Sequence, residues 1–195
     1  MPDAVVQSSP LAGMLVGQRQ RVLHVDGRDC TLAEVPFVEM LNLRGNGDDA
    51  AFSTAVQQAT GLYVPLRANG ASIDPQRQLL WLGPDEWLFK TRDGEGEAIA
   101  ASLRAALQGQ HHAVVEVGDG NTTLTVQGAA AADLLARGCP LDLHPRVFPT
   151  GALAQSHIAK AGATVLCLQA GTHYELTVRR SFADYLFRWL CAAGD

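Results

Sequence analysis

Residues 78–90 read QLLWLGPDEWLFK, and the fold class follows from this stretch and what surrounds it. Two apolar runs flank Gly83-Pro84-Asp85, a sequence typical of a tight turn, so the stretch predicts a β-hairpin. A helix is predicted after it, because apolar residues from Ile99 to Leu107 recur at three- and four-residue steps before Gly109. A hairpin followed by a helix favours an α+β fold over strict βαβ alternation.

The residues before the hairpin predict further strands and a helix. Residues 21–25 and 37–43 are rich in β-branched and other apolar side chains, which indicates strands. Asp48-Asp49 then supplies acids suited to a helix N-terminus. The apolar residues that follow recur with helical spacing, and Gly61 is a suitable C-terminal stop.

The same order of elements repeats after the hairpin and its helix. Strands are predicted at 112–117, 122–126, 152–158, 164–168 and 174–178, with a short helix at 129–137. Gly118-Asp119-Gly120-Asn121 predicts a hairpin turn. A last helix is predicted from a capping box formed by Ser181 and Asp184, followed by an apolar face.

The predicted fold is therefore α+β, with two sheet-and-helix lobes. We expect residues 1–18 to form an N-terminal arm, either mobile or extended for docking, because they contain proline and glycine without periodicity. Residues 19–110 would form the first lobe and residues 111–195 the second. Together the lobes would make one compact unit.

Composition excludes several classes of function. Of the 195 residues, 47% are hydrophobic and 18% charged, a balance typical of a packed core. The net charge of −5 and the scattered basic residues argue against nucleic-acid binding. No stretch reaches the ~20 apolar residues of a membrane span, and the N-terminus lacks a secretory signal pattern. We therefore expect a cytoplasmic protein that does not contact a membrane.

The sequence contains no recognisable set of catalytic residues. Its four cysteines have no metal-site spacing and predict buried thiols rather than disulfides in a reducing compartment. Gly94-Glu95-Gly96 lacks the third glycine of a dinucleotide loop and is flanked by acids. We accordingly predict no catalytic residue, no metal site and no bound cofactor in this chain.

Residues 138–148, GCPLDLHPRVF, are the best candidate for a functional surface. Two prolines restrict this non-periodic stretch, so Asp142, His144 and Arg146 could be presented to a partner with little loss of entropy. The alternative is that these groups only hold the loop together. Arg179-Arg180 is similarly open to two interpretations, a clamp for a partner carboxylate or a solvated pair.

Three stretches together resemble the gamma subunit family of heterotetrameric sarcosine oxidase. They are residues 82–88 (LGPDEWL), residues 138–148 continuing to Ala154-Gln155-Ser156, and residues 174–190 with VRRSFA at 178–183. Their order and spacing also match, and the resemblance runs from about Arg19 to the C-terminus. It adds Gln155 to the candidate interface residues.

The gamma family is in turn similar to the folate-binding domains of glycine-cleavage T-protein. Residues 115–119 (VEVGD) and 126–128 (VQG) echo that pattern, but Glu116 and Gly118 stand where it has an aspartate and a serine. The resemblance therefore favours an accessory role over an independent aminomethyltransferase. A stand-alone folate-binding module remains the alternative.

The resemblance implies a place in a four-subunit oxidoreductase. In such a complex the alpha, beta and delta subunits would hold FAD, FMN, NAD, tetrahydrofolate and zinc, and the gamma subunit would carry no catalytic group. The complex would convert sarcosine, tetrahydrofolate and oxygen to glycine, methylene-tetrahydrofolate and hydrogen peroxide. A related complex acting on N-methylglutamate or another N-methyl amino acid is a further possibility.

Overall fold

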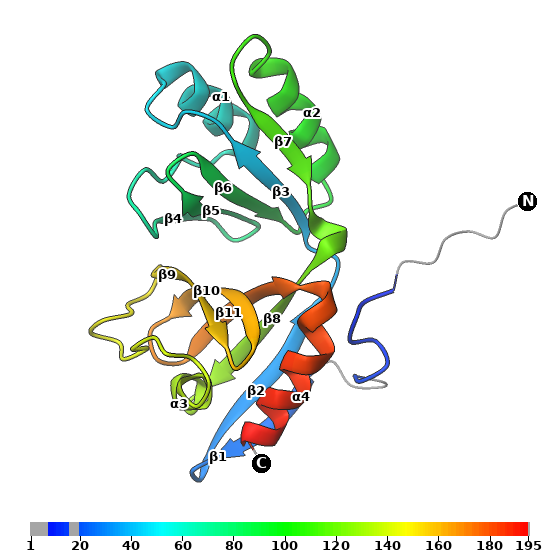
Figure 1. The fold of residues 1–195 in the computed structure, drawn as a ribbon, viewed down its shortest axis with the longest axis vertical. Coiled ribbons are helices and arrows are strands. Elements are labelled where there is room, and N and C mark those ends of the chain that lie inside the picture. The colour runs from blue at the N-terminus through cyan, green and yellow to red at the C-terminus, as the bar shows by residue number, and fades with distance from the viewer. Residues whose placement is uncertain (1–7, 16–19, 195) are drawn as a thin grey trace, which may run out of the picture.

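The computed structural model describes residues 8–15 and 20–194, and within them the fold is α+β, built on two antiparallel sheets (Figure 1). The larger sheet has the order β1-β2-β8-β11-β10-β9: Gln20–Val25, Arg28–Val35, Asn121–Gly128, His173–Arg179, Ala161–Gln169 and Leu153–Ile158. The smaller sheet has the order β4-β5-β6-β3-β7: Ala71–Ile73, Arg77–Gly83, Glu86–Thr91, Glu39–Arg44 and Ala113–Glu116. The predicted fold class is confirmed.

Helices cover the outer face of each sheet, and the inner faces meet at a junction (Figure 1). On the smaller sheet lie α1 and α2, and on the larger sheet α3 and α4; their bounds are Ala50–Thr60, Gly96–Ala106, Ala131–Ala136 and Ala183–Gly194. Short 3-10 turns are η1, Gly118–Gly120, and η2, Arg180–Phe182. The order of layers is therefore helix, sheet, sheet, helix.

The alternation of side chains along the strands produces these layers. In the predicted hairpin, Leu79 and Trp87 belong to the core beneath α1 and α2, whereas Leu80 and Leu88 belong to the apolar cluster at the junction. Because both faces of the hairpin are buried, its strands are apolar almost throughout. The junction cluster also receives Leu153 and Leu166 from the larger sheet.

Local sequence patterns predict most of the helices and strands correctly. Helix α1 begins after Asp49, whose carboxylate accepts a hydrogen bond from the Ala51 amide at 2.8 Å, and ends at Gly61 with a φ of 78°. The hairpin forms with Trp81 opposite Trp87, and α2 follows it as predicted. Strand β2 and the short strand β4 were not predicted, because neither is a continuous apolar run.

The sheets do not follow the predicted division at residue 110. Strands β1 and β2 precede the smaller sheet in the chain, yet β2 pairs with β8, with Leu32 opposite Val126. The chain thus enters the smaller sheet at β3 and leaves it at β7. Local sequence patterns predict a strand but not its distant partner, so residues 20–35 fall in the predicted first lobe although their strands belong to the larger sheet.

Two local predictions are wrong. Residues 118–121 do not close a hairpin, because η1 carries the chain from β7 in the smaller sheet to β8 in the larger one. The capping box is also not formed: η2 leads into α4, and the Asp184 carboxylate instead accepts hydrogen bonds from Arg188 at 3.0 Å.

The described part of the predicted N-terminal arm packs on the larger sheet. Leu11 is fully buried in that sheet's core, and residues 8–15 turn rather than extend. The Ser9 hydroxyl donates to the Glu34 carboxylate on β2. The rest of the predicted arm, residues 1–7 and 16–18, lies outside the described residues.

Candidate functional site

Buried side chains anchor the loop between α3 and β9 to the core of the larger sheet. Leu143 and Phe148 are 3% and 7% exposed, and both enter the core of the larger sheet. The Tyr174 hydroxyl donates to the Leu143 carbonyl at 3.2 Å, and its ring stacks on Phe148 with centroids 6.4 Å apart. These contacts fix the loop on β11.

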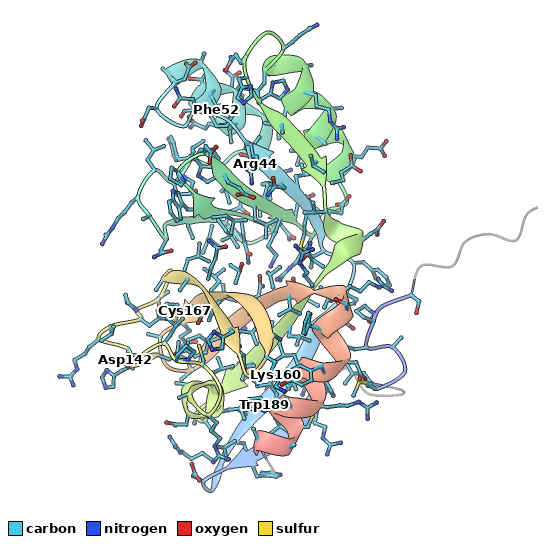
Figure 2. All side chains as sticks on the ribbon, in the orientation of Figure 1. Arg44, Phe52, Asp142, Lys160, Cys167 and Trp189 are labelled. Carbon is cyan, nitrogen blue, oxygen red and sulfur yellow. The ribbon has the colours of Figure 1, made fainter. Side chains whose placement is uncertain are left out.

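Polar groups of Asp142 and His144 hold the backbone of the loop, while the side chains remain exposed. The Asp142 carboxylate accepts a hydrogen bond from the His144 amide at 2.9 Å, and His144 Nδ1 accepts one from the Arg146 amide at 3.2 Å. These bonds hold the backbone of the loop. All three side chains are nevertheless exposed, and Figure 2 shows Asp142 on a loop that projects away from α4, which carries Trp189. Val147 adds an apolar side chain that is 62% exposed.

Arg179 and Arg180 lie at the other end of β11 from this loop. Both are exposed, and the Arg180 guanidinium donates to the Ser8 carbonyl at 2.6 Å. The loop contacts β11 at Tyr174, so about five residue steps, roughly 17 Å of strand, separate the two groups. The candidate residues therefore form two separate surfaces, which we call the loop surface (Asp142, His144, Arg146) and the arginine surface (Arg179, Arg180).

Gln155 belongs to neither surface. Its side-chain amide donates to the Leu82 carbonyl at 2.7 Å and so links β9 to the hairpin of the smaller sheet. The residue is exposed at the edge of the junction. Its observed contact is therefore one between the two sheets.

A buried ionic network at the junction was not predicted. Glu175 on β11 is 1% exposed and receives both Lys90 and Arg92 from the smaller sheet. Lys90 is 2% exposed and also donates to the Thr177 hydroxyl at 3.0 Å. Gln78 donates weakly to Glu175 at 3.4 Å, and its own side-chain oxygen has no hydrogen-bond partner among the described residues. The available signals were Lys90 directly after the apolar run Trp87-Leu88-Phe89 and Glu175 between Tyr174 and Leu176.

The electrostatics of this network are set by burial and by the paired charges. Burial alone would raise the pKa of Glu175, but Lys90 and Arg92 outweigh it and hold the pKa below its usual value. Burial lowers the pKa of Lys90, and the Glu175 carboxylate opposes that effect. Burial likewise lowers the pKa of the neighbouring His173. The network joins the sheets through charges that need one another to remain buried.

The described residues offer little for metal or thiol chemistry. Within them, no group of three or more His, Cys, Asp and Glu side chains is placed to hold a metal ion. Cys30, Cys139 and Cys167 are buried free thiols, and burial raises the pKa of Cys30 and of Cys167. In the same part of the chain, no helix is long and apolar enough to span a membrane.

Comparison with known proteins identifies the family. Residues 44–195 match the model of the "Sarcosine oxidase, gamma subunit family". The chain belongs to the sarcosine oxidase gamma subunit family. It is 32% identical over 168 residues to sarcosine oxidase subunit gamma of Corynebacterium sp. strain U-96, a match covering 85% of this chain and 80% of the relative. The predicted resemblance is confirmed.

Solved structures agree with this family assignment. A chain of heterotetrameric sarcosine oxidase from Corynebacterium sp. U-96, in complex with pyrrole 2-carboxylate, superposes with a TM-score of 0.86 at 28% identity, covering 96% of this chain and 94% of that one. The glycine cleavage aminomethyltransferase T of Bartonella henselae gives a TM-score of 0.66 at 13% identity, covering 94% of this chain and 56% of that one. The gamma family member therefore has an aminomethyltransferase-like fold.

Proposed function

We propose that this chain is the accessory, non-catalytic gamma subunit of a heterotetrameric sarcosine oxidase. The observation that carries the proposal is the match to a chain of such an enzyme over almost the full length of both. The complex would oxidatively demethylate sarcosine to glycine, transfer the one-carbon unit to tetrahydrofolate and release hydrogen peroxide. The gamma subunit would contribute a surface rather than a reacting group.

The proposal assigns the other components of the complex to other chains. The partners would be alpha, beta and delta subunits, which would hold FAD, FMN, NAD, tetrahydrofolate and zinc. In this proposal zinc is held by another subunit. A cytoplasmic location belongs to the same proposal, in keeping with buried thiols kept reduced.

The loop surface and the arginine surface are the proposed contacts with the partner subunits. The loop surface presents Asp142, His144 and Arg146 on a backbone already fixed by Tyr174, so docking would order few additional groups. The arginine surface offers two guanidinium groups suited to partner carboxylates. Gln155 would contribute by holding the sheets in register at the edge of the junction.

Purification of the tagged chain from its own host tests the assembly. We expect a yellow complex of four kinds of subunit that produces peroxide when sarcosine is added. A colourless chain that purifies alone would contradict the proposal.

Arginine variants test the two surfaces separately. Arg146→Ala and Arg179→Ala should each weaken retention of the partner subunits, and the double variant should do so additively because the sites are far apart. Arg67→Ala is the matched control, since Arg67 is an exposed arginine of the smaller sheet's lobe. Retention unchanged in the double variant would remove both surfaces from the interface.

A stand-alone folate-binding module is the second candidate, supported by the T-protein-like fold. Titration of the isolated chain with a reduced folate tests it. Binding at micromolar folate, without other subunits, would favour this candidate over the accessory role. Activity of the purified complex with N-methylglutamate in place of sarcosine would instead keep the accessory role and change the substrate.

A further inference from the structure

An acidic groove lies where the chain crosses between the two sheets. It encloses a cavity of about 310 Å³, lined by the β2–β3 crossover, the η1 crossover, the start of α2 and the packed part of the arm. The lining includes Ser9 and Pro10 from the arm and Arg180 from η2. Segments far apart in the sequence thus converge on one hollow.

The charge of this groove is strongly negative. Among the described residues, Glu39, Glu97, Glu116 and Asp119 line it, against one cation, Arg180. The Arg180 guanidinium is directed to the Ser8 carbonyl rather than to these acids. Arg104, which is not among the lining residues, offsets one of the four acids by pairing with Glu116, so the groove retains a net negative charge in a chain whose net charge is −5.

The acids differ in how far they are satisfied within the chain. Glu39 accepts a hydrogen bond from the Gly96 amide at 3.2 Å, and Glu116 pairs with Arg104 at 3.1 Å. Within the described residues, the carboxylates of Glu97 and Asp119 receive no such donor. These two exposed acids are available to a cation from outside the chain.

An apolar side chain stands beside these acids. Phe37 lines the same groove, is 53% exposed, and has a φ of 57°. A bulky aromatic residue is rarely found at positive φ, because its Cβ crowds the backbone there. Phe37 thus combines a strained backbone with a ring that is open to contact beside the acidic groove.

We propose that the acidic groove seats a segment of a larger subunit of the complex that carries lysine or arginine beside an apolar side chain. The basic groups would pair with Glu97 and Asp119, and the apolar side chain would pack on Phe37. This proposal rests on the accessory-subunit function and adds a contact separate from the loop surface. Charge complementarity decides the chemistry of the occupant, since a groove of this sign repels an acidic one.

Photocrosslinking from position 37 identifies the occupant. Replacing Phe37 with p-benzoylphenylalanine keeps an aromatic ring in the groove of the tagged chain expressed in its own host. After irradiation we expect a crosslinked peptide from a larger subunit with lysine or arginine close to the crosslinked residue. The same replacement at Tyr63, which is 71% exposed and outside the groove, is the control. A crosslink to a second copy of this chain, or none in an intact complex, would overturn the proposal.

Charge reversal tests the energetic role of the groove. Glu97→Lys/Asp119→Lys should lower the salt concentration that releases half of the partner subunits by roughly twofold or more, because ionic contacts are screened by salt. Asp29→Lys/Asp48→Lys changes the net charge equally at exposed positions outside the groove and should behave as wild type. If both double variants retain the partner subunits equally, the groove contact is refuted but the accessory-subunit function is not. If the wild-type chain purifies without partner subunits, the accessory-subunit function is refuted as well.

Discussion

Glu175 and the carboxylates of the acidic groove both lie near the meeting of the two sheets, but in opposite surroundings. Glu175 is 1% exposed and is neutralised by Lys90 and Arg92 of the other sheet. In the groove, Glu97 at the start of α2 and Asp119 in η1 are both exposed. The comparison indicates that acids satisfied inside the chain hold the sheets together, whereas acids left open are available to another subunit.

Removing the buried acid should give the largest effect. Glu175→Ala leaves Lys90 buried without its counter-charge, and we expect a loss of about 3–5 kcal/mol in the free energy of unfolding. Urea denaturation measures it. Glu116→Ala, which breaks an exposed pair with Arg104, should cost less than about 1 kcal/mol.

The double variant Lys90→Met/Glu175→Leu sharpens this result. It removes both buried charges and should recover much of the lost stability, because well-packed apolar side chains can replace a buried ion pair. If Glu175→Ala and Glu116→Ala destabilise equally, burial is not what separates the two groups of acids.

Truncating a side chain of the apolar cluster between the sheets should have the next largest effect on stability. Leu166 is 1% exposed in the cluster between the sheets, and Leu166→Ala should cost about 3 kcal/mol through lost burial and the cavity left behind. Leu66, which is 55% exposed, provides the control, since Leu66→Ala should change stability by about 0.5 kcal/mol or less. A negligible effect of Leu166→Ala would mean that the ionic network alone joins the sheets.

Acid should weaken the junction in two steps. The lowered pKa of His173 means that the unfolded state binds a proton first, so stability falls as the pH drops below about 6.5, the ordinary histidine value. Because the pKa of Glu175 is lowered in the folded state, its carboxylate contributes its full stabilisation above about pH 4.5. That contribution is lost as the pH falls through the folded-state pKa.

Urea unfolding between pH 3 and pH 8 separates these steps. Wild type and Glu175→Gln should differ most near neutral pH and converge in acid, and His173→Gln should flatten only the step near pH 6.5. A difference between wild type and Glu175→Gln that stays constant down to pH 3 would show that charge is not the basis of the network.

The groove acids should affect stability least. Glu97→Lys/Asp119→Lys should shift the free energy of unfolding by no more than about 0.5 kcal/mol, because both side chains are exposed. The same measurement on Asp29→Lys/Asp48→Lys provides the baseline. A loss above about 1 kcal/mol in the groove variant alone would make these acids structural, as Glu175 is.

Local sequence determined where most helices and strands lie. Asp49 and Gly61 bound α1, and Gly83-Pro84-Asp85 closes the hairpin, because capping and turn chemistry involve only neighbouring residues. The rigid loop at 138–148 was also predictable from its prolines. The resemblance in the stretches at 82–88, 138–156 and 174–190 supplied the family.

Only the tertiary structure decided which strands share a sheet and which charges meet. Strand β2 pairs with β8, and Glu175 meets Lys90, between segments separated by more than 80 residues. No local pattern encodes such distant partners, since the strand signal is the same whichever neighbour it joins. The acidic groove likewise exists only because two crossovers, the arm and α2 converge on one hollow.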